Sequence, residues 1–217
     1  MRIEIKKIAD LPTSTYHTAR YDKETIFIAG SSWERKKVKK ETGHMHSGQG
    51  LLYCVKDTRV ESYPTDTDML YIVEVLSNDI LFLGAKTDKN TFQLFSISEQ
   101  KVIKQASDPQ GGGCYGTFYV PAQKELIMNT RNGYLQIVDS ETLVIKESIR
   151  LTDPGIRLWQ IHYDEKEDII YTSDYLGTLY KIQKNGLKVL KKVCLFDLYE
   201  HNDNYDNPPS LWGLSSQ

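Results

Sequence analysis

The chain has 217 residues, of which 40% are hydrophobic, and its 27 basic and 29 acidic residues give a formal net charge of −2. This length allows a sizeable hydrophobic core, and the nearly balanced charge excludes the strongly basic class of nucleic-acid-binding proteins. No apolar run approaches 18 residues, so the sequence predicts no transmembrane helix.

The N-terminal segment and the cysteines predict an intracellular protein. Residues 1–7 alternate charged and apolar side chains and lack the apolar core of a signal peptide. The cysteines are odd in number and lack metal-ligand spacing, so we expect reduced, buried thiols at Cys54, Cys114 and Cys194. The expected location is the cytoplasm, without membrane association.

Four successive units of the chain each predict four short strands. Each unit opens on an aromatic strand, continues with a stiff apolar strand, and ends with two further strands that are joined by polar turns. In chain order the expected strands are 16–21, 26–28, 51–55 and 59–63; 71–75, 80–83, 91–95 and 101–104; 115–120, 126–128, 134–138 and 144–148; 159–163, 169–171, 178–182 and 188–193.

The spacing and polarity of these strands predict an all-β fold, a β-propeller-like array of about four four-stranded blades. Counted from Leu51, Phe92, Tyr134 and Thr178 in the third strands, the spacing is 41, 42 and 44 residues, which is typical of a propeller blade. Second strands are apolar on both faces, as buried strands are, whereas fourth strands alternate apolar residues with Lys or Glu, as edge strands do. A β-sandwich is the structural alternative.

The predicted blades form one domain over residues 1–217, with blades near 14–63, 69–107, 114–149 and 157–194. Residues 211–217 predict the first strand of a further blade or a strand that closes the ring, because Leu211-Trp212 repeats Leu158-Trp159. Three explanations stay open: a longer parent chain, a split gene, or pairing of 212–217 with the first unit. In the last case residues 3–8 add an outer strand.

The fourth unit resembles a degenerate WD repeat. It has Trp159 at the head of the blade, an apolar second strand, and the segment Thr172–Ile182. WD repeats end their third strand in Trp-Asp, and only Asp139 keeps that acid here; the Gly-His pair that opens a WD repeat is absent from every unit. The resemblance covers residues 14–195 and implies a rigid protein-interaction scaffold. Residues 158–182 also resemble the WD proteins of the diphthamide pathway, which implies methylesterase activity as an alternative.

A basic insertion in the first unit is the clearest departure from the repeat. It joins the second strand to the third and places five Lys or Arg residues within six positions next to a tryptophan. Such a loop is suited to an acidic partner or to a phosphate backbone, or it is merely a solvated surface loop. The residues expected to bind a partner are Trp33, Arg35, Lys36, Lys37, Lys39, Lys40 and Tyr175, with Trp159 and Trp212 as further aromatic candidates.

Other polar motifs predict structure rather than chemistry. His44 and His46 lack a third ligand at zinc spacing, and the acidic loop 197–206 lacks the spacing of a calcium loop, so no metal is expected. Gly111–Gly113 predicts a turn with unusual dihedral angles, since it does not match a phosphate loop. We expect His17 and His162 to be hydrogen-bonded structural histidines.

No catalytic motif and no cofactor signature stands out in the sequence. The sequence therefore favours a binding module whose partners are proteins, with self-association or partner blades completing the ring as a further expectation. A diphthamide-type methylesterase and an RNA- or phosphate-binding propeller that uses residues 34–40 are the alternatives, although the charge makes nucleic acid the less expected partner.

Overall fold

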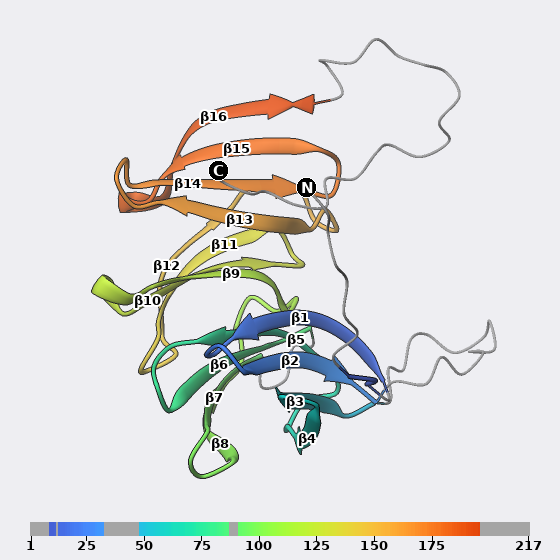
Figure 1. Ribbon diagram of the computed structural model, residues 1–217. Helices are drawn as coiled ribbons and strands as arrows, with labels where there is room; N and C mark the ends of the chain where they lie inside the picture. Colours follow the sequence, from blue (N-terminus) through green and yellow to red (C-terminus); the bar gives the residue numbers. More distant parts are fainter. Residues whose placement is uncertain (1–8, 12, 33–47, 87–90, 196–217) are drawn as a thin grey trace, which may run out of the picture.

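The computed structural model describes residues 9–11, 13–32, 48–86 and 91–195. These residues form sixteen β-strands in four four-stranded sheets, and every neighbouring pair of strands is antiparallel. Each sheet is a meander in which the strands pair in sequence order (Figure 1). The all-β prediction is confirmed.

The strands are short and follow one another along the chain. The first sheet contains β1 (Ser14–Arg20), β2 (Thr25–Ser31), β3 (Gly50–Lys56) and β4 (Arg59–Pro64). The second contains β5 (Leu70–Val75), β6 (Ile80–Ala85), β7 (Phe92–Ser96) and β8 (Lys101–Ala106). The third contains β9 (Cys114–Val120), β10 (Glu125–Thr130), β11 (Tyr134–Asp139) and β12 (Ile145–Arg150). The fourth contains β13 (Leu158–Asp164), β14 (Ile169–Asp174), β15 (Thr178–Gln183) and β16 (Lys188–Cys194).

All sixteen predicted strands are present, and they differ from the prediction mainly at their ends. The second strands continue past the apolar run into small or polar residues; β2, for example, extends to Ser31. Two 3-10 turns, η1 (Pro121–Gln123) and η2 (Asn185–Leu187), follow β9 and β15. Among the described residues no helix is long and apolar enough to cross a membrane.

Burial follows the predicted gradient within each sheet. The second strands β6, β10 and β14 are buried almost throughout, whereas the fourth strands β4, β8, β12 and β16 are mostly exposed. A second strand has a neighbouring strand on each side and packs on both faces, so apolar residues are favoured at every position. The fourth strand is an outer edge, where exposed Lys and Glu side chains oppose pairing with other chains.

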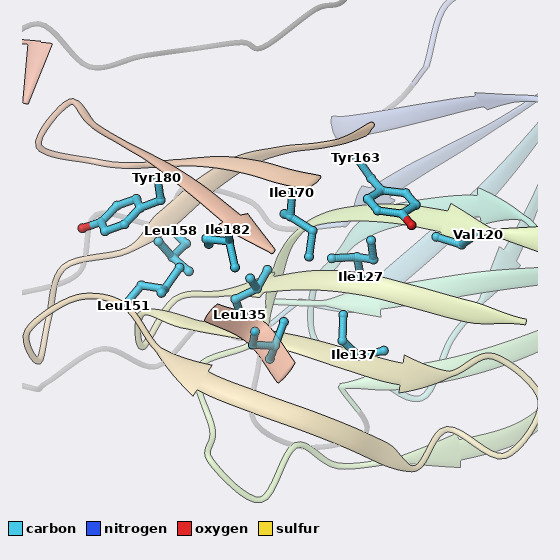
Figure 2. Packing of buried hydrophobic residues seen from close by; sticks show 11 residues of the cluster. Val120, Ile127, Leu135, Ile137, Leu151, Leu158, Tyr163, Ile170, Tyr180 and Ile182 are labelled. Atoms are coloured by element: carbon cyan, nitrogen blue, oxygen red, sulfur yellow. The ribbon is translucent and has the colours of Figure 1, made fainter. Parts of the chain in front are cut away.

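Three hydrophobic clusters hold consecutive sheets together. One cluster joins the first and second sheets, one the second and third, and one the third and fourth. Figure 2 shows the last of these, in which side chains of the third sheet such as Ile127 and Leu135 meet Ile170 and Ile182 of the fourth. Each such side chain contributes about 1.5–3 kcal/mol when it is fully buried. No sheet is stable alone, because its apolar face needs the next sheet.

The first strands of consecutive sheets lie side by side. β1 contacts β5, β5 contacts β9, and β9 contacts β13. Polar contacts cross each junction. Among them, the His17 Nδ1 meets the Val73 carbonyl at 3.0 Å, the Thr117 hydroxyl donates to Glu74 at 2.7 Å, and the Asn129 amide donates to the Gln160 carbonyl at 3.0 Å. These contacts fix the first strands relative to one another and so place residues of all four sheets at a common end.

Candidate functional site: an aromatic row flanked by cations

Each of the four first strands contains a β-bulge at the same place, near its start. In β1 the pairing with β2 passes from Thr15 directly to His17, so Tyr16 is the extra residue. Tyr71 in β5 and Tyr115 in β9 are extra residues in the same way. In β13 the bulge contains Trp159 together with its neighbour Gln160. An aromatic residue therefore lies at the equivalent bulge of every sheet, and we call these four residues the aromatic row.

The rings of the aromatic row follow one another from sheet to sheet. Ring centroids are 4.9 Å apart for Tyr16 and Tyr71, 5.1 Å for Tyr71 and Tyr115, and 5.4 Å for Tyr115 and Trp159. These distances are typical of favourable aromatic pairs. Tyr115 is buried at 4% exposure, while the other three rings are partly exposed. The row is thus a partly exposed surface that spans all four sheets.

Tyr175 extends the row at its fourth-sheet end. It directly follows β14, and its backbone NH donates to the Arg157 carbonyl at 2.9 Å. Its ring centroid is 6.3 Å from that of Trp159, and 48% of the residue is exposed. Lys86 after β6 and Arg131 after β10 occupy the same position, and their backbone NH groups donate to the residues before β5 and β9. The ends of the second strands β6, β10 and β14 therefore each place one residue at the equivalent position near the row.

Three cations lie around Tyr115. The Lys86 Nζ is 5.4 Å from the ring centroid of Tyr71 and 5.5 Å from that of Tyr115, and the Arg157 guanidinium is 5.9 Å from the Tyr115 centroid. Arg131 is close enough to act electrostatically on both Lys86 and Tyr115. Such cation–π contacts stabilise by about 0.5–2 kcal/mol each. We call Lys86, Arg131 and Arg157 the cation cluster.

The charges of the cation cluster are not balanced by carboxylates. Within the described part of the chain, none of the three side chains forms an ion pair. Burial lowers the pKa of Lys86, and the positive charges of Arg157 and Arg131 lower it further. Burial raises the pKa of Tyr115, and the same two arginines oppose that shift. Burial is the larger cause of both shifts, and the smaller contribution of the two arginines has the sign expected of nearby positive charge.

The Tyr115 hydroxyl is buried, and no described residue forms a hydrogen bond with it. Leaving a buried hydroxyl without a partner costs about 1–3 kcal/mol. The ring of Tyr115 is nevertheless central to the row, between Tyr71 and Trp159. The combination of a buried hydroxyl and unbalanced cations is what makes this end of the array a candidate site.

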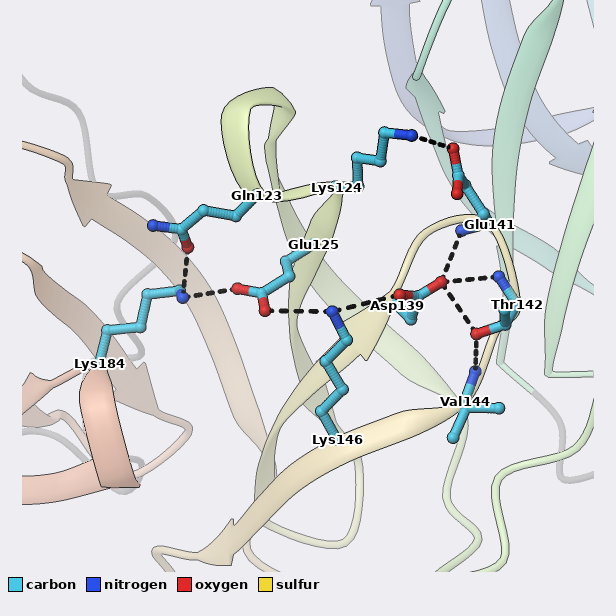
Figure 3. A network of polar contacts seen from close by, with 9 residues as sticks. All are labelled: Gln123, Lys124, Glu125, Asp139, Glu141, Thr142, Val144, Lys146 and Lys184. Atoms are coloured by element: carbon cyan, nitrogen blue, oxygen red, sulfur yellow. Dashed lines mark hydrogen bonds and ion pairs between the residues drawn. The ribbon is translucent and has the colours of Figure 1, made fainter.

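The opposite end of the third and fourth sheets has a different charge arrangement (Figure 3). There Lys184 lies 2.6 Å from Glu125, and Lys146 lies 3.3 Å from Glu125 and 3.1 Å from Asp139. Backbone and hydroxyl hydrogen bonds from Thr142 hold the pKa of Asp139 well below its usual range, and the lysine assists. Each lysine of this network has a carboxylate, and Lys184 links the fourth sheet to the third.

Most of the partner-binding residues predicted from the sequence lie outside the described residues. This applies to Trp33, Arg35, Lys36, Lys37, Lys39 and Lys40, to His44 and His46, to the acidic loop 197–206 and to Trp212. The two predicted candidates that are described, Tyr175 and Trp159, are neighbours at the end of the aromatic row. The strands that flank the basic insertion, β2 and β3, end and begin at Ser31 and Gly50, which is the end of the first sheet that carries Tyr16.

The structural interpretations of the other motifs have mixed outcomes. His17 is hydrogen-bonded, as expected, and burial lowers its pKa. The expectation for His162 is wrong: it stacks on Tyr171 and meets the edge of Phe118, with no hydrogen bond to a described residue. All three residues of Gly111–Gly113 have positive φ angles, as predicted for this turn.

The cysteines are free, as predicted, but only Cys114 is fully buried. Cys54 on β3 and Cys194 at the end of the outer strand β16 are partly exposed. The described residues contain no group of three or more His, Cys, Asp or Glu residues that is suited to hold a metal ion. In the same part of the chain, neither His17 nor His162 is hydrogen-bonded to a hydroxyl or thiol side chain.

Sequence reasoning missed Tyr71, Tyr115 and the cation cluster as site residues. A signal for the tyrosines was available, because the predicted first strands all begin with an aromatic residue, at positions 16, 71, 115 and 159. A half-buried strand also favours tyrosine, so the pattern alone does not separate packing from binding. The cations carried no such signal, since they lie in turns with different neighbours.

No protein-family model and no curated protein matches the chain. Its structure is similar to that of the computationally designed protein Ika4, with a TM-score of 0.56 and 8% identity, over 82% of this chain and 98% of Ika4. It is also similar to the computationally designed protein Ika8, with a TM-score of 0.57 and 9% identity, over 83% of this chain and 50% of Ika8. At this level of identity the similarity concerns the fold alone.

Proposed function

We propose that this chain is a non-catalytic binding module that engages a protein partner through the aromatic row and the cation cluster. The observation that carries the proposal is the repetition of a bulged aromatic residue in all four sheets, with ring centroids 4.9–5.4 Å apart, beside three cations that form no ion pair with a described residue. Tyrosine, tryptophan and arginine are the residues that most often dominate binding energy at protein interfaces.

The finer architecture that we propose is a WD-like β-propeller arrangement of the four sheets. Consecutive meanders whose first strands contact one another, at a repeat of 41 to 44 residues between third strands, support it. In such an arrangement the first strands are central, and the residues at their starts share one face with the turns that follow the second strands. The aromatic row and Tyr175 then belong to that face.

The partner that this face suits is an acidic segment of a protein. Flat aromatic rings supply contact area with little loss of side-chain entropy, and unpaired Lys and Arg residues complement carboxylates. The net charge of −2 does not favour long-range attraction of nucleic acid. Nothing in the described part of the chain favours the methylesterase alternative, since neither described histidine is hydrogen-bonded to a hydroxyl or thiol side chain.

Differential selection from a displayed random-peptide library tests the proposal. The immobilised chain is the target, and a Tyr71→Ala/Trp159→Ala double variant is used for counter-selection. We expect the peptides that bind only the unmodified chain to be enriched in Asp and Glu and to lose binding as salt rises. The partly exposed rings of Tyr71 and Trp159 make the double variant a test of the surface rather than of the core.

A matched control is Tyr134→Ala, which removes a partly exposed tyrosine of β11 that lies outside the row. Equal loss of binding in the control and in the double variant would place the binding surface elsewhere. Peptides that lack acidic enrichment would contradict the charge of the proposed partner. Binding to single-stranded RNA but to no peptide would replace the proposal with the nucleic-acid alternative.

A further inference from the structure

We infer that the cation cluster is a binding site for a phosphoryl group, held over the ring of Tyr115. The inference rests on the proposed function in one respect, since it assigns a ligand chemistry to part of the same face. The inference goes beyond the proposed function because it concerns three named cations and one buried hydroxyl rather than the whole surface.

The first argument is electrostatic. The Lys86 Nζ lies 5.5 Å from the ring centroid of Tyr115, and the Arg157 guanidinium lies 5.9 Å from it. The charge of Arg131 also acts on Tyr115. Partial burial of Lys86 lowers its pKa, and the positive charges of Arg157 and Arg131 lower it further, as repulsion between like charges does. Within the described residues no carboxylate relieves it. An anion bound among the three cations removes this repulsion, so the site has a preference for negative charge built into it.

The second argument concerns the kind of anion. Three positive charges exceed what one carboxylate neutralises, whereas a phosphoryl dianion balances two of them and accepts hydrogen bonds at three oxygens. Two of the cations are arginines, whose planar guanidinium groups bind phosphate oxygens in pairs. The rings of Tyr71 and Trp159 flank Tyr115 at 5.1 Å and 5.4 Å and supply apolar surface for the group that carries the phosphate.

The third argument is the buried hydroxyl. Tyr115 is 4% exposed, and no described residue forms a hydrogen bond with its hydroxyl. A row that served packing alone would be filled equally well by phenylalanine, as Phe82, Phe92 and Phe95 fill the core of the second sheet without a polar group. Retention of a hydroxyl next to unpaired cations indicates a polar ligand at this place.

Titration with inorganic phosphate at constant ionic strength tests the inference. The full chain is titrated at pH 8 with phosphate, with phenyl phosphate and with acetate, and binding is followed by calorimetry. We expect saturable binding of both phosphates and a weaker response to acetate. Phosphate affinity should fall at pH 6, because the phosphate loses its second charge there.

Substitutions separate this site from general attraction of anions. Lys86→Met and Arg157→Gln should each weaken phosphate binding at least about tenfold, because each removes one of three cations. The controls are Lys188→Met and Arg59→Gln, which remove exposed cations at the opposite ends of the fourth and first sheets and should leave affinity unchanged. Absence of saturable phosphate binding, or equal weakening in the controls, would overturn the inference.

The two proposals fail separately. Displayed peptides carry no phosphate, so selection of acidic peptides without phosphate binding would leave the proposed function in place and remove this site. If Lys86→Met abolishes phosphate binding but no peptide can be selected, the phosphoryl site would stand and the proposed function would be contradicted. Stronger binding of acetate than of phosphate would show that the cluster serves carboxylates and would contradict the inference.

Discussion

The two ends of the sheets use positive charge in opposite ways. At the end shown in Figure 3, Lys146 and Lys184 each meet a carboxylate within 3.3 Å, and the pair Lys184–Glu125 joins two sheets with side chains that are only 12% and 15% exposed. At the aromatic end, Lys86 and Arg157 meet rings and, among the described residues, no acid. In the described part of the chain, paired charge thus links two sheets, whereas the cation cluster has aromatic rings as its contacts.

The largest effect should come from removing the centre of the aromatic row. Tyr115→Ala deletes a ring that is 96% buried between two others, so we expect a loss of about 3–5 kcal/mol in the free energy of unfolding, measured by urea denaturation. Tyr115→Phe keeps the ring and removes the unpartnered hydroxyl, so it should be neutral or slightly stabilising. A Phe variant as unstable as the Ala variant would mean that the hydroxyl is structurally bonded after all.

Glu74 is a carboxyl group whose hydrogen bond comes from a hydroxyl rather than from a cation, and it provides a second test. It lies between the two ends, at the junction of β5 and β9, where Thr117 supplies its hydrogen bond in place of a cation. Burial raises the pKa of Glu74 from its ordinary 4.5 to about 7, against the lowering effect of that hydrogen bond. The folded protein therefore holds this proton more tightly than the unfolded chain does.

The stability contributed by this proton is complete below about pH 4.5 and is lost as the pH rises through 7, with a total of about 3 kcal/mol. Glu74→Gln should remove this part of the pH dependence. The unfolding free energy of the variant should therefore rise relative to that of the unmodified chain as the pH rises from 4.5 to 8. The measurement is the difference in unfolding free energy between the two proteins across that range. A difference that is independent of pH would show that Glu74 is ionised in the folded state.

Loss of Lys184 from the ion-pair network shown in Figure 3 should lower the unfolding free energy. Lys184→Met removes the ion pair with Glu125 and the hydrogen bond to Gln123, and it should destabilise the fold by about 1–2 kcal/mol. The estimate is moderate because Lys146 continues to neutralise Glu125. Thermal unfolding in low and high salt gives the measurement, and the loss should persist at high salt, since the pair is largely buried.

The smallest change in unfolding free energy is expected for Lys86 of the cation cluster. Lys86→Met removes cation–π contacts but also relieves repulsion by Arg131 and Arg157, so the unfolding free energy should change by less than about 0.5 kcal/mol. The same urea titration that is used for Lys184→Met compares the two lysines directly. Equal destabilisation by both substitutions would remove the distinction between the two ends.

Secondary structure was largely predictable here because the repeat presents the same pattern four times. The apolar runs of β6, β10 and β14 and the alternation in β8 and β16 reflect local burial, which period and polarity report directly. The propeller arrangement stays a proposal, because patterns within strands carry no information on how four sheets sit around one another.

The candidate site was less predictable because it depends on relations between sheets. The bulges at Tyr71 and Tyr115 arise from register, and one extra residue in a strand leaves no trace in its composition. Lys86 and Arg157 lie near Tyr115 only because β5, β9 and β13 are neighbours. Tyr175 was predicted as an aromatic hot-spot candidate from its residue type, which is a local property, and the structure places it beside the row.

The recurring bulge has a consequence for how this molecule tolerates change. A bulged residue is outside the regular hydrogen-bond ladder, so its side chain can be exchanged without shifting the register of the strands that flank it. The fourth sheet illustrates this, since it carries tryptophan where the other three carry tyrosine. Because the four positions lie in four separate repeats, each side chain can change independently of the other three, with the largest cost in stability at the buried Tyr115.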